Sequence, residues 1–133
     1  MPAATYFNLL ATLMKKNGNG QRLSSANKYR VHFDTGKFPL VNGFWSLTMY
    51  SVEYFCVGNP LNRYTLSQRN KFNLDPDRWV DLYLQHQPPA GNLVANWLPA
   101  PARDFALILR IYWPKKPVLK GSWEPPPVVR AQR

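Results

Sequence analysis

Residues 43–50 read GFWSLTMY, a stretch in which apolar side chains take every second position. Trp45, Leu47 and Met49 fall on one side of an extended chain, and Phe44, Ser46, Thr48 and Tyr50 fall on the other. Successive side chains of a strand point to opposite faces of its sheet, so this period of two predicts a β-strand. The row that begins with Trp45 is the expected buried face.

The same alternation recurs in three other segments of the chain. These are YRVHF (29–33), WVDLYLQH (79–86) and FALILRIYW (105–113). Turn residues separate them, and no helical stretch lies between them. Short strands with regular turn signals predict a mainly β fold, an antiparallel β-sandwich or barrel.

The beginning of the chain carries a different pattern. Apolar residues over 5–16 follow the spacing of one helix face, at Tyr6, Leu9, Leu10, Leu13 and Met14. This predicts a short N-terminal amphipathic helix over 1–17, then a polar linker over 18–28, a β domain over 29–127 and a tail over 128–133. Such a helix must bury its apolar stripe, so we expect a homo-oligomer formed through this helix or through a sheet edge.

Composition fits one ordered domain with a basic surface. The 133 residues are 45% hydrophobic and 14% aromatic, which argues against disorder. Seventeen Lys and Arg against seven Asp and Glu give a formal charge of +10. Such a charge can indicate a polyanion partner, but these residues are scattered singly or in pairs. We therefore do not expect nucleic acid to be the partner.

Signals for membranes, export, metals and cofactors are missing from this sequence. No apolar run reaches the roughly 18 residues of a membrane span. The lysines at 15 and 16 follow the apolar stretch instead of preceding it, the wrong order for a secretory signal, so a cytoplasmic location is the default expectation. The single cysteine, Cys56, belongs to no cysteine–histidine cluster, and no nucleotide-binding glycine motif occurs. We expect neither a metal site nor a cofactor.

Seven motifs in a fixed order give the β region a family resemblance. They are YRVHF, FWSLTMY, NPLNRYTL, LYLQH, NWLPAP, LILRIYWPK and GSWEPPPV. Together, over about residues 27–129, they resemble family 1214 of bacterial domains of unknown function. That resemblance implies a β-sandwich of jelly-roll type, commonly found beside a companion β domain, family 1254. It implies no substrate, because the role of the family is not established.

The sequence also departs from this family pattern. These 133 residues contain no segment like the companion domain. Ser51 and Gly58 stand where the family often has aspartates. Any chemistry that depends on either carboxylate in the family is therefore in doubt here.

Polar side chains on the outward rows of the strands are the candidate ligand-binding residues. If the strands are neighbours, these rows line one surface. Arg110 stands in a strongly apolar strand, where its guanidinium would need Asp81 or Asp104, or would serve an anionic or carbonyl ligand. The opposing interpretation is a solvated sheet face. The row residues are Tyr50, Gln85, Arg110 and Tyr112.

A loop at 59–64, NPLNRY, adds two further candidates. Asn-Pro favours a turn, and Asn62 can bond its own backbone, which indicates a structured corner. The functional interpretation puts Asn62 and Arg63 at the mouth of the β domain, as ligand-binding residues on a loop.

Two functions of different classes follow from these residues. The first is a small module that binds a partner subunit or a small polar or anionic ligand. The alternative is a small cofactor-independent enzyme, a hydrolase or lyase, whose pocket is lined by the four row residues. His86 would then be the candidate general base, because histidine titrates near neutrality, with Tyr50 and Arg110 as further catalytic candidates. Whether the protein is an enzyme stays open at this point.

Overall fold

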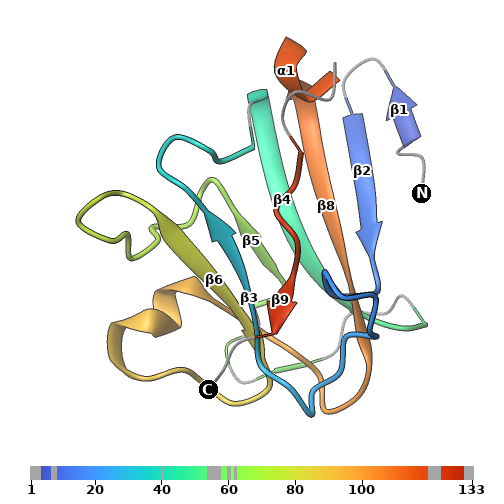
Figure 1. The fold of residues 1–133 in the computed structure, drawn as a ribbon, viewed down its shortest axis with the longest axis vertical. Helices are drawn as coiled ribbons and strands as arrows, with labels where there is room; N and C mark the ends of the chain where they lie inside the picture. The colour runs from blue at the N-terminus through green and yellow to red at the C-terminus, as the bar shows by residue number, and fades with distance from the viewer. Residues whose placement is uncertain are drawn as a thin grey trace.

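Strands carry almost all of the regular structure of this protein (Figure 1). The computed structural model describes residues 4–6, 9–39, 41–53, 58–59, 61, 63–119 and 124–130. In chain order the elements are β1 (Ala4–Tyr6), β2 (Leu9–Met14), β3 (Tyr29–Phe33), β4 (Val41–Ser51), β5 (Thr65–Ser67), β6 (Val80–Gln85), the 3-10 helix η1 (Gly91–Asn96), β7 (Trp97–Pro99), β8 (Phe105–Pro114), α1 (Lys116–Leu119) and β9 (Val129–Arg130).

The strands form two sheets. A five-stranded sheet has the order β1-β2-β8-β4-β5, and a four-stranded sheet has the order β7-β6-β3-β9. All pairings are antiparallel except that of β7 with β6, which is parallel. The longest strands, β4 and β8, lie side by side in the five-stranded sheet. The predicted mainly β class is confirmed, and the jelly-roll type stays a prediction.

One hydrophobic core lies between the sheets, and the sequence alternation places its residues correctly. The Phe33 ring of the four-stranded sheet lies 6.1 Å from the Trp45 ring of the five-stranded sheet. Burying a large apolar side chain contributes roughly 1.5–3 kcal/mol, so these rows hold the sheets together and their outer faces point apart. The inner rows, all at most 4% exposed, are Tyr29, Val31, Phe33, Trp45, Leu47, Met49, Val80, Leu82, Leu84, Leu107, Leu109 and Ile111.

The predicted N-terminal helix is wrong. Within the described residues this part of the chain forms β1 and β2, and β2 adds to the exposed edge of β8 in a register that runs from Leu9 opposite Tyr112 to Met14 opposite Leu107. The run LLATLM is apolar on both faces of a strand, so it satisfies a helix stripe and a strand equally well. The strand is favoured because its backbone can form hydrogen bonds with the free edge of β8.

The predicted linker and tail also contain core residues. Leu23 is fully buried, its N–H donates to the carbonyl of Lys15 (3.1 Å), and its own carbonyl accepts from the N–H of Phe105 (3.1 Å). Val128 is buried as well, and its carbonyl accepts from the N–H of Gly18 (2.8 Å). Leu23 and Val128 are therefore packed parts of the β domain.

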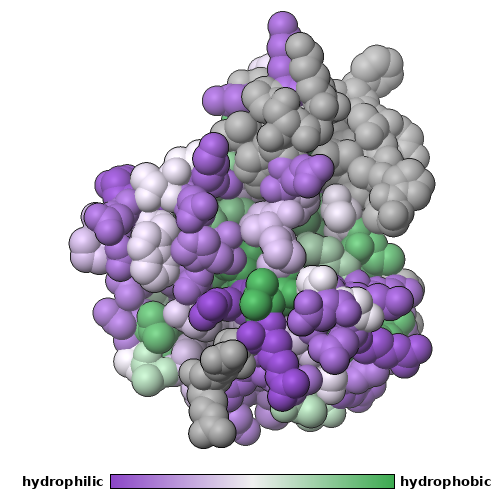
Figure 2. Space-filling view, in the orientation of Figure 1, coloured by the Kyte–Doolittle hydropathy of each residue, from purple (hydrophilic) through white to green (hydrophobic). Residues whose placement is uncertain are grey.

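Helices play a small part in the described chain. The 3-10 helix η1 has six residues and α1 has four. No helix among the described residues is long and apolar enough to cross a membrane. The face seen in Figure 2 is largely hydrophilic, with hydrophobic side chains in small separate groups.

Gly43 allows β4 and β8 to approach each other at an irregularity in their pairing. The register shifts between Val41 and Phe44, and Trp113 on the facing strand has a left-handed φ of 54°. A methyl group at position 43 would lie 2.8 Å from the carbonyl oxygen of Tyr112. We expect Gly43→Ala to lower the free energy of unfolding by about 1–3 kcal/mol, as measured by urea denaturation.

Gly58→Ala is the matched control for this change. A methyl group there would meet no atom of the described residues within 4 Å, and the backbone does not require a left-handed conformation. The control should unfold within about 0.5 kcal/mol of the wild type. Equal stability of the two variants would contradict a close approach at Gly43.

Candidate functional site

A groove of about 840 Å³ opens beside the four-stranded sheet. Its floor comes from β3 and β6, where Arg30 lies opposite Tyr83 in antiparallel register. Both residues belong to the outward rows, because the alternate residues of these strands are in the core. Val129 and Arg130 of β9 form one side, and Figure 1 shows η1 at the same end of the molecule. We call this hollow the basic groove; its lining residues are Lys28, Arg30, Tyr83, Gln85, Pro88, Pro89, Ala90, Leu93, Val129 and Arg130.

The charge of the groove has one sign. Lys28, Arg30 and Arg130 line it, and no acidic residue of the described chain does. All three cations are exposed, and none forms an ion pair with a described residue. A guanidinium presents a planar fork of donors that matches a carboxylate or phosphate, and an ammonium adds a point charge. The positive charge of these three side chains therefore favours an anion in the groove.

Arg63, predicted to bind a ligand, instead holds one wall of this groove in place. Its Nη1 donates to the carbonyl of Val94 (2.7 Å) and to the carbonyl of Trp97 (2.9 Å), at the end of η1. The carbonyl of Val94 also accepts from the N–H of Trp97, so the cationic donor of Arg63 adds a second bond at the end of this helical turn. Arg63 is thus used for structure, on the wall that carries Leu93.

Two further side chains hold the same wall. The buried amide of Asn96 bonds the backbone of Asn73 twice, accepting from its N–H (2.7 Å) and donating to its carbonyl (2.9 Å). The indole N–H of Trp97 donates to the carbonyl of Gln85 (2.8 Å). These bonds explain the motif NWLPAP as packing, and they fix η1 against β6.

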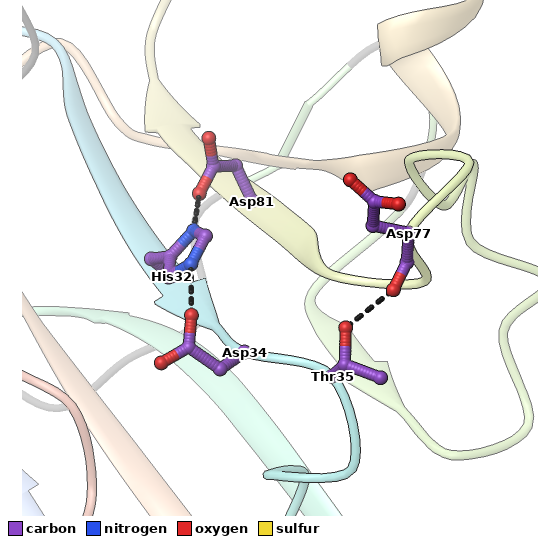
Figure 3. Close-up of polar contacts among 5 residues, drawn as sticks. All are labelled: His32, Asp34, Thr35, Asp77 and Asp81. Carbon is purple, nitrogen blue, oxygen red and sulfur yellow. Dashed lines mark hydrogen bonds and ion pairs between the residues drawn. The ribbon is translucent and has the colours of Figure 1, made fainter.

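Next along the same sheet face, a histidine lies between two carboxylates (Figure 3). Nδ1 of His32 is 2.6 Å from Asp81 Oδ1, and Nε2 is 2.7 Å from Asp34 Oδ1. Only the cationic imidazolium can donate from both nitrogens, so this arrangement favours the charged ring. The ring also lies 5.2 Å from that of Trp79, and the hydroxyl of Thr35 donates to the carbonyl of Asp77 nearby. We call His32, Asp34 and Asp81 the histidine clip.

Two pKa values are shifted on this sheet face. Partial burial alone lowers the pKa of His32, but the hydrogen bonds and charges of Asp81 and Asp34 outweigh it, and the net pKa is raised. Burial raises the pKa of Tyr83, the charge of Asp81 adds to this, and Arg30 opposes it. Tyr83 therefore stays a neutral donor in the groove. Asp81, the acid whose charge acts on the pKa of Tyr83, forms an ion pair with His32.

Three predicted site residues lie on the outer face of the other sheet. Nη2 of Arg110 donates to the hydroxyl of Tyr50 (3.3 Å), and its guanidinium lies 5.8 Å from the centre of that ring. Tyr112 pairs instead with Phe44, at 6.1 Å between ring centres. The expected carboxylates are engaged elsewhere, since Asp81 meets His32 and Asp104 meets Arg22.

The structure does not bring all four row residues together. Tyr50, Arg110 and Tyr112 share the outer face of the five-stranded sheet, whereas Gln85 belongs to the four-stranded sheet. The outer faces point apart, so the four do not line one pocket. Gln85 instead lines the basic groove, where its Nε2 donates to the carbonyl of Gln87 (2.7 Å).

The remaining candidates are placed as follows. His86 is exposed, its Nδ1 is 2.9 Å from the carbonyl oxygen of Ala100, and it lines a separate hollow of about 270 Å³ together with Arg103. Asn62 and Cys56 lie outside the described residues. No described group of three or more His, Cys, Asp or Glu residues could hold a metal ion.

The cations of the basic groove were not among the predicted site residues. A signal for Arg30 exists in YRVHF, where it faces outward on a strand, like Tyr83 in LYLQH. Only the pairing of β3 with both β6 and β9 shows that Arg30 and Arg130 share a groove. These residues are about 100 positions apart in the chain, beyond the reach of strand periodicity.

Comparison with known proteins agrees with the motifs. A family model described as "Protein of unknown function (DUF1214)" matches residues 8–116, most of the chain. The chain belongs to this family. No curated protein matches it.

Two solved structures resemble this DUF1214 domain. A protein from Vibrio parahaemolyticus superposes with a TM-score of 0.81 at 23% identity over 95% of this chain. An uncharacterised protein from Burkholderia cenocepacia gives a TM-score of 0.53 at 16% identity over 98%. The domain spans 31% of the length of each, and at such identities the likeness concerns the fold alone.

The histidine clip makes stability depend on pH. A histidine whose pKa is raised in the fold contributes stability that is fully present below the unfolded pKa, about 6.5. That contribution is lost as the pH rises through the higher folded pKa. We expect the melting temperature of the wild type to exceed that of His32→Gln by more at about pH 6 than at about pH 9.

Thr35→Val is the control for this measurement. It removes a hydroxyl that bonds Asp77 beside the clip and carries no titratable group. Its margin below the wild type should stay constant over the same pH range. A constant margin for His32→Gln as well would contradict the clip.

Proposed function

We propose that this domain is a binding module for a small anionic molecule and that the basic groove is its site. The observation that carries the proposal is the lining of the groove, with three cations that have no partner among the described residues and no acid. The clip contributes to it, because a cationic His32 offsets part of the negative charge of Asp81 and Asp34 on the sheet face next to the groove. An anion entering the groove meets three exposed cations and no acid among the described lining residues.

The walls suggest what else the ligand carries. Pro88, Pro89, Leu93 and Val129 give the groove apolar surface beside its cations. Its volume, about 840 Å³, lies in the range of small-molecule sites, roughly 300–1,000 Å³. We therefore propose a carboxylate or phosphate attached to an apolar group, with the Tyr83 hydroxyl as a further donor. A local cluster of three cations suits a small anion better than a polyanion, which would follow a longer stripe.

Assembly through a sheet edge stays a prediction beside this proposal. Assembly through an N-terminal helix does not apply, since strand β2 occupies that part of the chain. The strands at the ends of the two sheets, β1, β5, β7 and β9, have only two or three residues each. Short edge strands are a common protection against pairing with another chain, so they do not favour this route.

The test measures anion binding by isothermal titration calorimetry. The probes are citrate and inorganic phosphate, titrated at low salt into the wild type, Arg30→Gln and Lys71→Gln. Loss of a charge-assisted hydrogen bond costs about 1.5–3 kcal/mol, so Arg30→Gln should weaken binding at least about tenfold.

Lys71→Gln is the matched control. Lys71 is exposed on the loop between β5 and β6, does not line the groove, and its loss changes the net charge equally. It should bind like the wild type. Equal weakening by both variants would show attraction by net charge alone, and no saturable binding of either probe would also contradict the proposal.

A further inference from the structure

A second hollow, of about 280 Å³, has a chemistry unlike that of the basic groove. It comes from the loop before β4, from β4 itself and from the loop between β5 and β6. None of its lining residues is charged, and none lines the groove. We call it the aromatic slot; its lining residues are Phe38, Trp45, Gln68, Asn70, Phe72 and Leu74.

Three aromatic rings of the slot lie almost parallel. The ring centres of Phe38 and Trp45 are 6.0 Å apart, those of Phe38 and Phe72 are 6.1 Å apart, and those of Trp45 and Phe72 are 6.2 Å apart. Their planes differ by 27°, 11° and 18° in the same order. Trp45 is buried, and Phe33 stacks on Phe38 at 5.2 Å, so the core holds these rings in place. The half-buried rings of Phe38 and Phe72, backed by the buried Trp45, therefore give the slot a rigid aromatic platform.

Two amides stand beside this platform with fixed orientations. Nε2 of Gln68 donates to the carbonyl of Gly43 (3.0 Å), and Oδ1 of Asn70 accepts from the N–H of Ser67 (2.8 Å). Each amide thus has one end bonded to backbone. The other ends, the Oε1 acceptor of Gln68 and the Nδ2 donor of Asn70, bond no described residue. The slot offers one acceptor and one donor beside an apolar surface.

We propose that the aromatic slot binds a single pyranose ring of a neutral saccharide. The C–H groups on one face of a pyranose are slightly positive, and the faces of aromatic rings are negative, so the two attract each other. Sugar hydroxyls both donate and accept, which suits the acceptor of Gln68 and the donor of Asn70. The absence of charge among the lining residues selects a neutral ligand, and the small volume limits it to one ring.

The experiment titrates methyl glucoside, methyl galactoside and methyl mannoside into the full chain. Saturation-transfer NMR reports which ring protons contact the protein, and the titration gives the affinity. We expect saturable binding of at least one of the three, with transfer strongest on the protons of one ring face. Phe72→Leu keeps an apolar side chain but removes a ring, and it should weaken binding at least fivefold.

Amide variants complete the test. Gln68→Ala should weaken binding at least threefold, and Gln87→Ala, an exposed glutamine outside the slot, should not change it. Melting temperatures establish that each variant is folded. No saturable binding of any of the three glycosides would overturn the proposal, and so would equal affinity in folded Phe72→Leu. Binding of free adenine with the same loss in Phe72→Leu, but not of the glycosides, would assign the slot to a planar base instead.

Discussion

The pairing of β4 with β8 is the constraint on which the rest of the structure depends. These are the two longest strands, and their register runs without a break from Phe44 opposite Tyr112 to Ser51 opposite Phe105. Their inner rows supply seven of the 19 residues of the buried core cluster, and the outer edge of β8 accepts β2. Gly43 sets how closely the strands approach at one end, and its neighbour Trp45 supplies one ring of the aromatic slot.

The four-stranded sheet uses its outer face in two ways. At one end, the histidine clip pairs Asp81 and Asp34 with one cation, and so offsets part of the negative charge of the sheet face. At the other, Arg30 lies beside Tyr83 with no acid lining the groove. Because unscreened charge acts over several ångströms, the clip and the groove belong to one electrostatic arrangement. The three cations of the groove are thereby left exposed to an incoming anion.

The two proposed sites differ in how far sequence patterns could have found them. Gln85 was expected to bind a ligand, and it does line the groove, but with partners other than Arg110. Arg63 was expected at a binding surface, and it bonds the end of η1 instead. The outward direction of Gln85 and the loop position of Arg63 were readable, while the neighbours of both depended on which strands and loops pack together. The amides of the slot gave no signal, because Gln68 and Asn70 look like ordinary turn residues.

The sequence by itself determined the mainly β class, the four alternating strands, the buried rows that begin with Trp45 and Val80, and the family. These follow from local periodicity and from ordered motifs, and both are properties of the chain alone. Only the tertiary structure decided that residues 9–14 form a strand, because the free edge of β8 selects between two conformations that the run LLATLM fits equally well. It also decided which side chains share a groove, because contacts between distant strands depend on sheet order and register.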